Sequence, residues 1–407
     1  MELLRIGGGR PLNGSLRIQG AKNSVLPIMA AALISGGTSV IHNCPKLSDV
    51  DVSIRILKHL GCAVTRDGTD VFIDSSGMSR HSIPDSLMRE MRSSVVFLGA
   101  ILARAGEAEL SAPGGCELGP RPIDLHLAAI REFGSEIDKS GGRISVKLTK
   151  TADRASVRHI SFPTPSVGAT ENAMLLAAGT PGKTIITNPA REPEIVDLQE
   201  FLLKLGVEVS GAGGGMITVC APGEYAANAE HTIIPDRIVT ATYLSAAASA
   251  GGHLRLLGAN PEHLKPVIRS LREMGCEIFA DSKTGELQIT KKAPLKAAKP
   301  ISTKPYPDFP TDAQPPVMAA CLKAEGTTVF VENIFESRYR HIEELQRLGA
   351  DITVSGKTAI VCGVPKLKGV EMFAADLRGG AALVVAALGA DGESTIRELR
   401  HIDRGYE

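Results

Sequence analysis

The stretches LPIMAAALISGGTSVIHN (residues 26–43) and ILKHLGCAV (residues 56–64) form the first copy of a pattern that recurs along the chain. Each copy has an Ala-rich apolar segment, a Gly-containing turn, a short β-branched run and an amphipathic segment that ends in glycine. The hydrophobic period switches from that of a helix to that of a strand and back, so each copy predicts helix, turn, strand and helix.

The glycines that close the copies are evenly spaced. They are Gly61, Gly134, Gly206, Gly275 and Gly349, which lie 73, 72, 69 and 74 residues apart. Glycine suits the left-handed position that ends a helix, and the β-branched run after it suits a strand. A sixth copy starts at ALVVAALGADGESTIRE, and its closing glycine would fall near position 415, so we expect an incomplete sixth unit in this sequence.

One such unit cannot cover both faces of its helices, so the copies should pack with apolar helices inward and sheets outward. Six copies divide into two groups of three, with EHTIIPDRIV (residues 230–239) as the boundary. The predicted fold class is α/β, in two domains. A solenoid is the alternative, but units of roughly 70 residues exceed the usual solenoid repeat of about 20–50 residues.

Composition excludes several classes of function. Lys+Arg and Asp+Glu are both 45 in 407 residues, so the overall charge does not favour nucleic acid or an anionic membrane as a partner. Seven cysteines without a CxxC pair predict neither a disulfide framework nor a zinc site. No apolar signal core and no membrane span is present, so we expect a cytoplasmic protein. Phosphate-loop, dinucleotide and His-based metal motifs are also absent, which predicts no cofactor and no metal.

Cations recur at the starts of the apolar helices. Lys22 precedes the first helix, Arg92 the second and Arg378 the sixth. Inward helices would bring these starts together at one end of each domain, and two such ends facing each other would form a cationic cleft. For any one arginine, including Arg338 and Arg404, a surface salt bridge is the alternative.

The stretch Lys22-Asn23-Ser24 allows two interpretations. Asn23 or Ser24 can cap the helix, and exposed amides beside a lysine would bind an anion. The alternative is a solvated lysine beside an N-cap residue.

Two further residues are candidates for chemistry. Cys116 follows two glycines in PGGCELGPRPIDLHL (residues 113–127), where two prolines flank Arg121, so it is either a reactive thiol or a small apolar residue in a turn. Asp312, in YPDFPTDAQPPVMAA, precedes the fifth apolar helix and is either an N-cap or a base that takes a proton from a hydroxyl. Asp308 is the rival acid.

Ten ordered motifs resemble those of the enolpyruvyl transferases, in the branch that acts on a sugar nucleotide. They are GAKNSVLPI at 20–28, PKLSDVD at 45–51, GGCELGPRPIDLHL at 114–127, SVGAT at 166–170, AREPEIVDL at 190–198, PDRI at 235–238, YPDFPTDAQ at 306–314, ENIFESR at 332–338, DLRGG at 376–380 and HIDRGYE at 401–407. The resemblance implies two inside-out α/β domains, each of three βαβαββ-type units around a pseudo-threefold axis. It implies a first domain of residues 1–21 and 234–407 and a second of residues 22–233.

The resemblance also implies a reaction. The enolpyruvyl group of phosphoenolpyruvate would pass to the 3′-hydroxyl of UDP-N-acetylglucosamine with release of phosphate, through a tetrahedral intermediate, in the first committed step of peptidoglycan synthesis. Cys116 would be the proton donor to the methylene carbon, able to form an adduct with phosphoenolpyruvate, and the position alkylated by fosfomycin. Asp312 would accept the hydroxyl proton.

By the same resemblance, the remaining residues fall into two binding groups. The phosphoenolpyruvate group would be Lys22, Asn23, Arg121, Arg404, Arg338 and Arg378. The nucleotide-sugar group would be Arg92, Arg121, Pro122, Ile123, Asp124, Leu125, Ser166, Val167, Gly168, Asp312 and Ile334. Two alternatives are 5-enolpyruvylshikimate-3-phosphate synthase and a UDP-sugar-binding regulator without turnover.

Overall fold

The computed structural model describes residues 2–111, 123–149 and 153–407. Its described residues pack into two compact units. Unit 1 holds the chain up to Gln19 together with Pro235–Glu407, and unit 2 holds the described residues from Gly20 to Ile234. Each unit buries its own hydrophobic cluster.

Unit 2 contains seven described α-helices and three sheets. The helices are α1 (Lys22–Ala31), α2 (Ser48–Leu60), α3 (Asp85–Glu90), α4 (Phe97–Ala105), α5 (Asp124–Arg131), α6 (Val167–Gly179) and α7 (Pro193–Lys204). The strands are β3 (Thr38–His42), β4 (Ala63–Asp67), β5 (Asp70–Asp74), β6 (Ser82–Ile83), β7 (Glu107–Ser111), β8 (Ser135–Asp138), β9 (Arg143–Leu148), β10 (Val157–Ser161), β11 (Lys183–Thr187), β12 (Glu208–Ser210), β13 (Met216–Cys220) and β14 (Asn228–Thr232).

Unit 1 contains five described α-helices and three sheets. The helices are α8 (Arg237–Ala250), α9 (Lys265–Glu273), α10 (Gln314–Cys321), α11 (Ile342–Arg347) and α12 (Leu377–Gly389). The strands are β1 (Leu3–Gly7), β2 (Leu12–Arg17), β15 (Gly252–Leu257), β16 (Glu277–Asp281), β17 (Glu286–Lys291), β18 (Ile301–Ser302), β19 (Thr327–Val331), β20 (Asp351–Ser355), β21 (Thr358–Cys362), β22 (Glu371–Phe373) and β23 (Glu393–Arg397). Short 3-10 helices precede α4 (Arg92–Val96), α9 (Pro261–Leu264) and α10 (Thr311–Ala313), and two more lie at Ser140–Gly142 and Leu399–His401.

Five of the six sheets share one topology. Their orders are β14-β3-β5-β4, β6-β7-β9-β8, β10-β11-β13-β12, β2-β15-β17-β16 and β18-β19-β21-β20. In each, the first two strands are parallel and the two later pairings are antiparallel. The predicted repeat of one α/β unit is therefore confirmed.

The sixth sheet is built differently. It has three described strands in the order β1-β23-β22, and β1 from the beginning of the chain pairs antiparallel with β23. The next strand, β2, does not continue this sheet but pairs in parallel with β15 in another one. The beginning of the chain therefore completes two sheets of unit 1.

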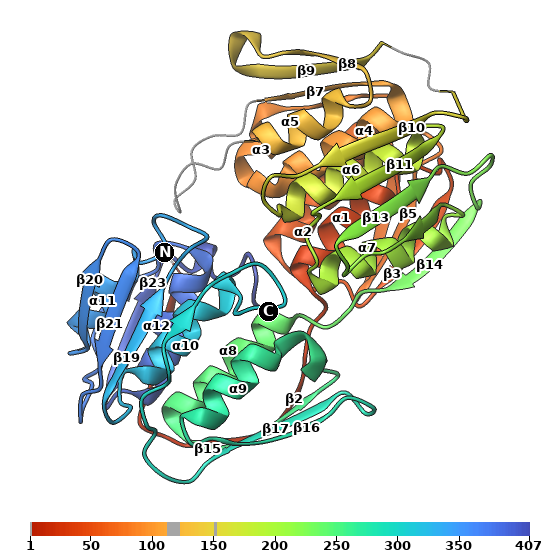
Figure 1. Ribbon diagram of the computed structural model, residues 1–407. Helices are drawn as coiled ribbons and strands as arrows, with labels where there is room; N and C mark the ends of the chain where they lie inside the picture. The colour runs from red at the N-terminus through yellow and green to blue at the C-terminus, as the bar shows by residue number, and fades with distance from the viewer. Residues whose placement is uncertain (1, 112–122, 150–152) are drawn as a thin grey trace. The chain divides into compact units, whose positions relative to one another are not determined.

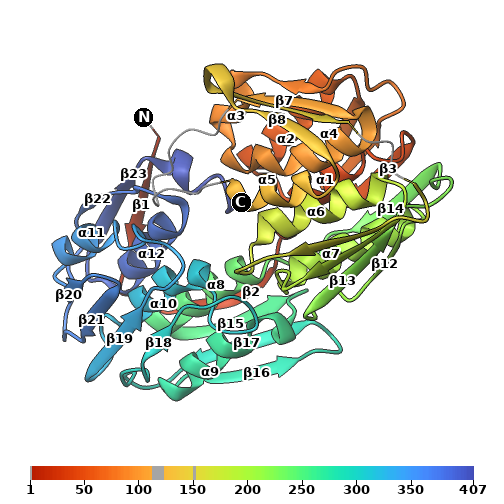
Figure 2. The same cartoon turned by 45° about the horizontal axis from the view of Figure 1, so that its top comes forward.

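Helices fill the interior of each unit. In unit 1, α8, α10 and α12 pack against one another, and the three sheets lie around them (Figures 1 and 2). Ten of the thirteen residues of α12 are buried, because the helix is surrounded by other helices and by its own sheet. The inward packing of Ala-rich helices, predicted from the repeat, is confirmed.

The closing glycines have the predicted backbone. Gly61, Gly134, Gly206, Gly275 and Gly349 all have φ between 73° and 106°. This left-handed region strains residues that carry a Cβ, so glycine ends each of these helices without strain. None of the described helices is both long and apolar enough to span a membrane.

Candidate active site

Asp312 in unit 1 lies between two buried arginines. It sits in the 3-10 turn Thr311–Ala313 that leads into α10, and 28% of its side chain is exposed. Its Oδ1 accepts from Arg338 Nη2, and its Oδ2 lies 3.2 Å from Arg378 Nε. Each carboxylate oxygen therefore contacts a different guanidinium, and the carboxylate is only partly buried.

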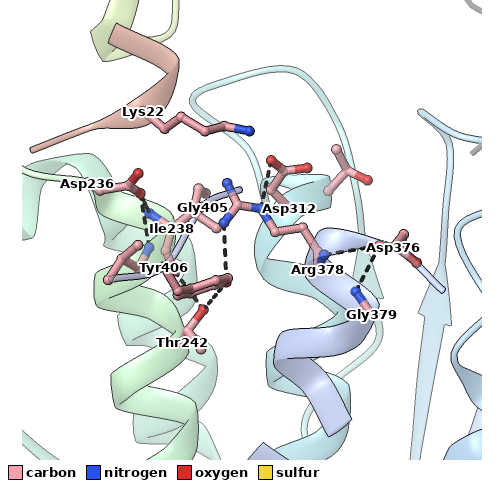
Figure 3. Close-up of polar contacts among 12 residues, drawn as sticks. Lys22, Asp236, Ile238, Thr242, Asp312, Asp376, Arg378, Gly379, Gly405 and Tyr406 are labelled. Carbon is pink, nitrogen blue, oxygen red and sulfur yellow. Dashed lines mark hydrogen bonds and ion pairs between the residues drawn. The ribbon is translucent and has the colours of Figure 1, made fainter. Parts of the chain in front are cut away.

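Arg378 is held by the beginning of α12. Asp376 is the N-cap of this helix, and its Oδ1 accepts from the backbone amides of Arg378 (3.0 Å) and Gly379 (2.9 Å), as Figure 3 shows. Only 3% of Arg378 is exposed. Burial lowers the pKa of Arg378, but Tyr406 and Asp312 raise it by more, so the guanidinium stays charged.

Arg338 is fixed from its other side. Its Nε donates to Thr311 Oγ1 at 3.1 Å, and this hydroxyl donates to the buried carboxylate of Glu332 at 3.0 Å. Glu332 also accepts from the backbone amide of Ile334 at 2.8 Å. Glu332 thus ties the turn that carries Asp312 to the segment that carries Ile334 and Arg338.

The structure excludes the interpretation of Asp312 as an N-cap residue. Pro310, not Asp312, is the N-cap residue of the turn, and no side chain caps it. Asp308 is exposed. The carboxylate of Asp312 contacts two arginines instead of capping a helix.

Arg404, another predicted residue of unit 1, lies in the turn that follows the 3-10 helix Leu399–His401.

Lys22 in unit 2 is buried, contrary to the interpretation as a solvated lysine. Its Nζ lies 3.0 Å from Asp49 Oδ2, and the two side chains are 10% and 1% exposed. The prediction that Asn23 or Ser24 caps α1 is also wrong, because Ala21 is the N-cap residue and no side chain caps this helix. Ser24 instead donates its hydroxyl to Asp197.

Asp197 lies on α7 and accepts three hydrogen bonds, one of them from Ser24 in the first turn of α1. Its Oδ2 accepts from Ser24 and from the backbone amide of Ile234 at 3.3 Å, and its Oδ1 lies 2.8 Å from His231 Nε2. Asp197 and His231 are 4% and 5% exposed. The segment that carries Lys22 and Asn23 is therefore anchored to α7 and to β14.

The predicted nucleotide-sugar residues of unit 2 lie on two helix starts. Ile123 is the N-cap residue of α5, which begins with Asp124 and Leu125. Ser166 caps α6, where its Oγ accepts from the amide of Ala169 at 3.4 Å, and Val167 and Gly168 form the first turn.

One amide joins these two helix starts. Asn172 Nδ2 lies 2.9 Å from His126 Nδ1 on α5, and it donates to the carbonyl of Val95 at 3.1 Å. Burial lowers the pKa of His126 to about 4, so the ring is neutral and its Nδ1 accepts. A Cβ on Gly168 would come within 2.9 Å of His126 Cε1, so glycine is needed there.

Three predicted residues lie outside the described residues: Cys116, Arg121 and Pro122. The side chain of Arg92 also lies outside them, although its backbone begins the 3-10 turn before α4. The described part of the chain contains no group of three or more His, Cys, Asp or Glu that could hold a metal ion.

Sequence reasoning missed several residues of these clusters. Asp49, Glu332 and Tyr406 belong to the motifs PKLSDVD, ENIFESR and HIDRGYE, and Asn172 is the second residue after SVGAT. The motifs were therefore the available signal. A motif gives the residue type, but the partner of each side chain comes from a distant segment and is visible only in the structure.

Comparison with known proteins identifies a family of carboxyvinyltransferases. The family profile described as EPSP synthase (3-phosphoshikimate 1-carboxyvinyltransferase) matches residues 6–407, so the chain belongs to this family. Within it, the chain is 48% identical over 409 residues to UDP-N-acetylglucosamine 1-carboxyvinyltransferase 2 of Caldanaerobacter subterraneus, covering 100% of this chain and 96% of the relative. It is 42% identical over 417 residues to UDP-N-acetylglucosamine 1-carboxyvinyltransferase of Rhodospirillum centenum, covering 100% and 95%.

Solved structures give the same fold. The enolpyruvyl transferase NikO of Streptomyces tendae matches with a TM-score of 0.86 at 26% identity, over 99% of this chain and 94% of that chain. EPSP synthase of Acinetobacter baumannii matches with a TM-score of 0.72 at 20% identity, over 99% and 95%. The enolpyruvyl transferase fold that the sequence predicted is thus confirmed.

Proposed function

We propose that this protein transfers the enolpyruvyl group of phosphoenolpyruvate to the 3′-hydroxyl of UDP-N-acetylglucosamine and releases phosphate. This reaction is the first committed step of peptidoglycan synthesis. The observation that carries the proposal is Asp312, a partly exposed carboxylate whose two oxygens contact two buried arginines. The names of the relatives that match along the whole chain support the nucleotide sugar as acceptor.

The chemistry assigns a role to each member of this cluster. Asp312 takes the proton of the attacking sugar hydroxyl while the hydroxyl oxygen bonds to the central carbon of phosphoenolpyruvate. A proton adds to the methylene carbon and gives a tetrahedral intermediate, and loss of phosphate with that proton restores the double bond. Phosphoenolpyruvate carries several negative charges, and guanidinium forks such as those of Arg338 and Arg378 suit its carboxylate and phosphate.

Residues of unit 2 complete the proposal. We assign Lys22, Asn23 and Arg121, with Arg404 of unit 1, to phosphoenolpyruvate, and Cys116 to the proton that adds to the methylene carbon. The segments of Ile123–Leu125 and Ser166–Gly168, with Arg92, take the nucleotide sugar. Residues 1–21 with 234–407, and residues 22–233, would then be the two domains of the enzyme.

Phosphate release tests the proposal. The protein is incubated with phosphoenolpyruvate and either UDP-N-acetylglucosamine, shikimate 3-phosphate or no acceptor. We expect phosphate release only in the reaction that contains UDP-N-acetylglucosamine as acceptor. Release with shikimate 3-phosphate, the acceptor in the family description, would assign the other reaction. Binding of the nucleotide sugar without any release would identify a regulator without turnover.

A further inference from the structure

The hydroxyl of Tyr406 lies in a chain of hydrogen bonds whose direction is determined. Thr242 Oγ1 lies 2.9 Å from the carbonyl of Ile238, which can only accept, so the proton of Thr242 points to that carbonyl. Tyr406 Oη lies 2.9 Å from Thr242 Oγ1 and must therefore donate to it. The free lone pair of Tyr406 then accepts from Arg378 Nη1 at 3.2 Å, as Figure 3 shows.

This chain of bonds controls the orientation of Arg378. One nitrogen of its guanidinium donates to Tyr406 and another, Nε, lies 3.2 Å from Asp312 Oδ2, so the plane of the group is fixed at two points. The guanidinium carbon also lies 5.5 Å from the centre of the Tyr406 ring. Burial raises the pKa of Tyr406, which keeps the hydroxyl protonated and able to donate to Thr242.

We propose that Tyr406 is a positioning residue of the transferase reaction: its hydroxyl, itself fixed by Thr242, sets the plane of Arg378 and through it the orientation of Asp312. Tyr406 contacts neither the reacting atoms nor Asp312 in this assignment. The inference rests on the proposed function, because it takes Asp312 as the base.

The test is Tyr406→Phe, which keeps the ring beside Arg378 and removes the hydroxyl. We expect kcat for phosphate release to fall about tenfold, because Arg378, which contacts the base Asp312, loses a hydrogen bond. The Kd for UDP-N-acetylglucosamine and the urea midpoint of unfolding should change little. Thr242→Val should lower kcat by about threefold, Thr242→Ser should restore it, and the double variant should be no worse than Tyr406→Phe.

Tyr225→Phe is the matched control. Tyr225 also uses its hydroxyl in a hydrogen bond, to the carbonyl of Ala178 at 2.9 Å, but both of these residues belong to unit 2. Removal of the Tyr225 hydroxyl should leave kcat for phosphate release unchanged. Equal kcat values for wild type and Tyr406→Phe, or a loss in Tyr406→Phe that Tyr225→Phe matches, would overturn the inference.

A second readout is independent of turnover. In ¹⁵N-arginine-labelled protein, the Nε–H signal of Arg378, assigned through Arg378→Lys, should exchange slowly with water in wild type and much faster in Tyr406→Phe. Unchanged exchange would contradict the inference even if the enzyme is active. If wild type releases no phosphate but the exchange responds, the proposed function fails while the positioning of Arg378 stands.

Discussion

Asp312 in unit 1 and Asp197 in unit 2 are both carboxylates that lie near the beginning of an inward helix, but their surroundings differ. Asp312 is in the turn that leads into α10, and Asp197, on α7, contacts Ser24 in the first turn of α1. Asp312 is partly exposed and contacts two guanidiniums, whereas Asp197 is 4% exposed and accepts from a hydroxyl, an imidazole and a backbone amide. A partly exposed carboxylate can exchange a proton with a substrate. A carboxylate whose acceptor positions are filled by the protein holds segments together. Two carboxylates near helix beginnings thus have different tasks, because the groups around them differ.

The largest expected effect concerns turnover at Asp312. Asp312→Asn should lower kcat by roughly 10²–10⁴-fold, because the amide cannot accept the hydroxyl proton. The free energy of unfolding should fall by less than about 2 kcal/mol, since the side chain is partly exposed. Phosphate release and urea unfolding measure the two quantities. Asp308→Asn, at the exposed acid four residues earlier, is the control, and an equal loss there would remove the distinction between the two carboxylates.

The second prediction concerns the effect of Asp197 on the free energy of unfolding. Asp197→Ala leaves Ser24, His231 and the amide of Ile234 without their acceptor, so the free energy of unfolding should fall by about 2–4 kcal/mol. Urea unfolding followed by circular dichroism measures it. Glu200→Ala, at an exposed position of the same helix α7, should change it by less than about 0.5 kcal/mol. An Asp197→Ala protein as stable as wild type would show that this network does not anchor α1.

The third prediction concerns a carboxyl group in a buried setting of unit 2. Burial, with the nearby charges of Glu194 and Glu192, raises the pKa of Glu171 to about 8. The folded protein then keeps a proton that the unfolded chain loses above pH about 4.5, so the stability from this group falls by about 1.4 kcal/mol per pH unit until about pH 8.

Glu171→Gln removes this dependence. The variant should gain stability relative to wild type between pH 5.5 and pH 8, as measured by urea unfolding at both values, while Glu200→Gln should not. A difference between variant and wild type that is the same at both pH values would show that Glu171 does not hold a proton in the folded state.

The smallest expected effect is at a helix cap. Ser166→Ala removes a single long hydrogen bond of 3.4 Å to the amide of Ala169, so unfolding should become easier by about 0.5 kcal/mol. Thermal unfolding measures this loss. Because Ser166 is also assigned to the nucleotide sugar, titration calorimetry should show weaker binding than the loss of stability explains. Unchanged affinity would restrict Ser166 to its capping role.

The repeat was predictable from the sequence because it depends on local signals. The closing glycines need a left-handed backbone, and the Ala-rich segments need a buried neighbour, so both leave a regular pattern. The meeting of Arg378 and Asp312 followed from the same regularity, since each begins an inward helix.

The partners of individual polar side chains were not predictable. Ser24 looked like a cap but bonds to Asp197, which is 173 residues away in the sequence. Tyr406 and Thr242 are 164 residues apart, and neither segment carries a pattern that indicates the other. Such pairs depend on which helices become neighbours, and hydrophobic periodicity does not specify that.

The place where the chain enters and leaves unit 2 has a consequence for the order of folding. Unit 2 is contiguous in its described parts, and its two ends meet, because the amide of Ala21 donates to the carbonyl of Ile234 at 2.8 Å. Strands β1 and β2 are synthesised first, yet their partners β23 and β15 come from the far side of this long insertion. Closing so long a loop costs conformational entropy, which a folded unit 2 removes by holding its ends together. Folding of unit 2 therefore favours the later pairing of β1 with β23 and of β2 with β15.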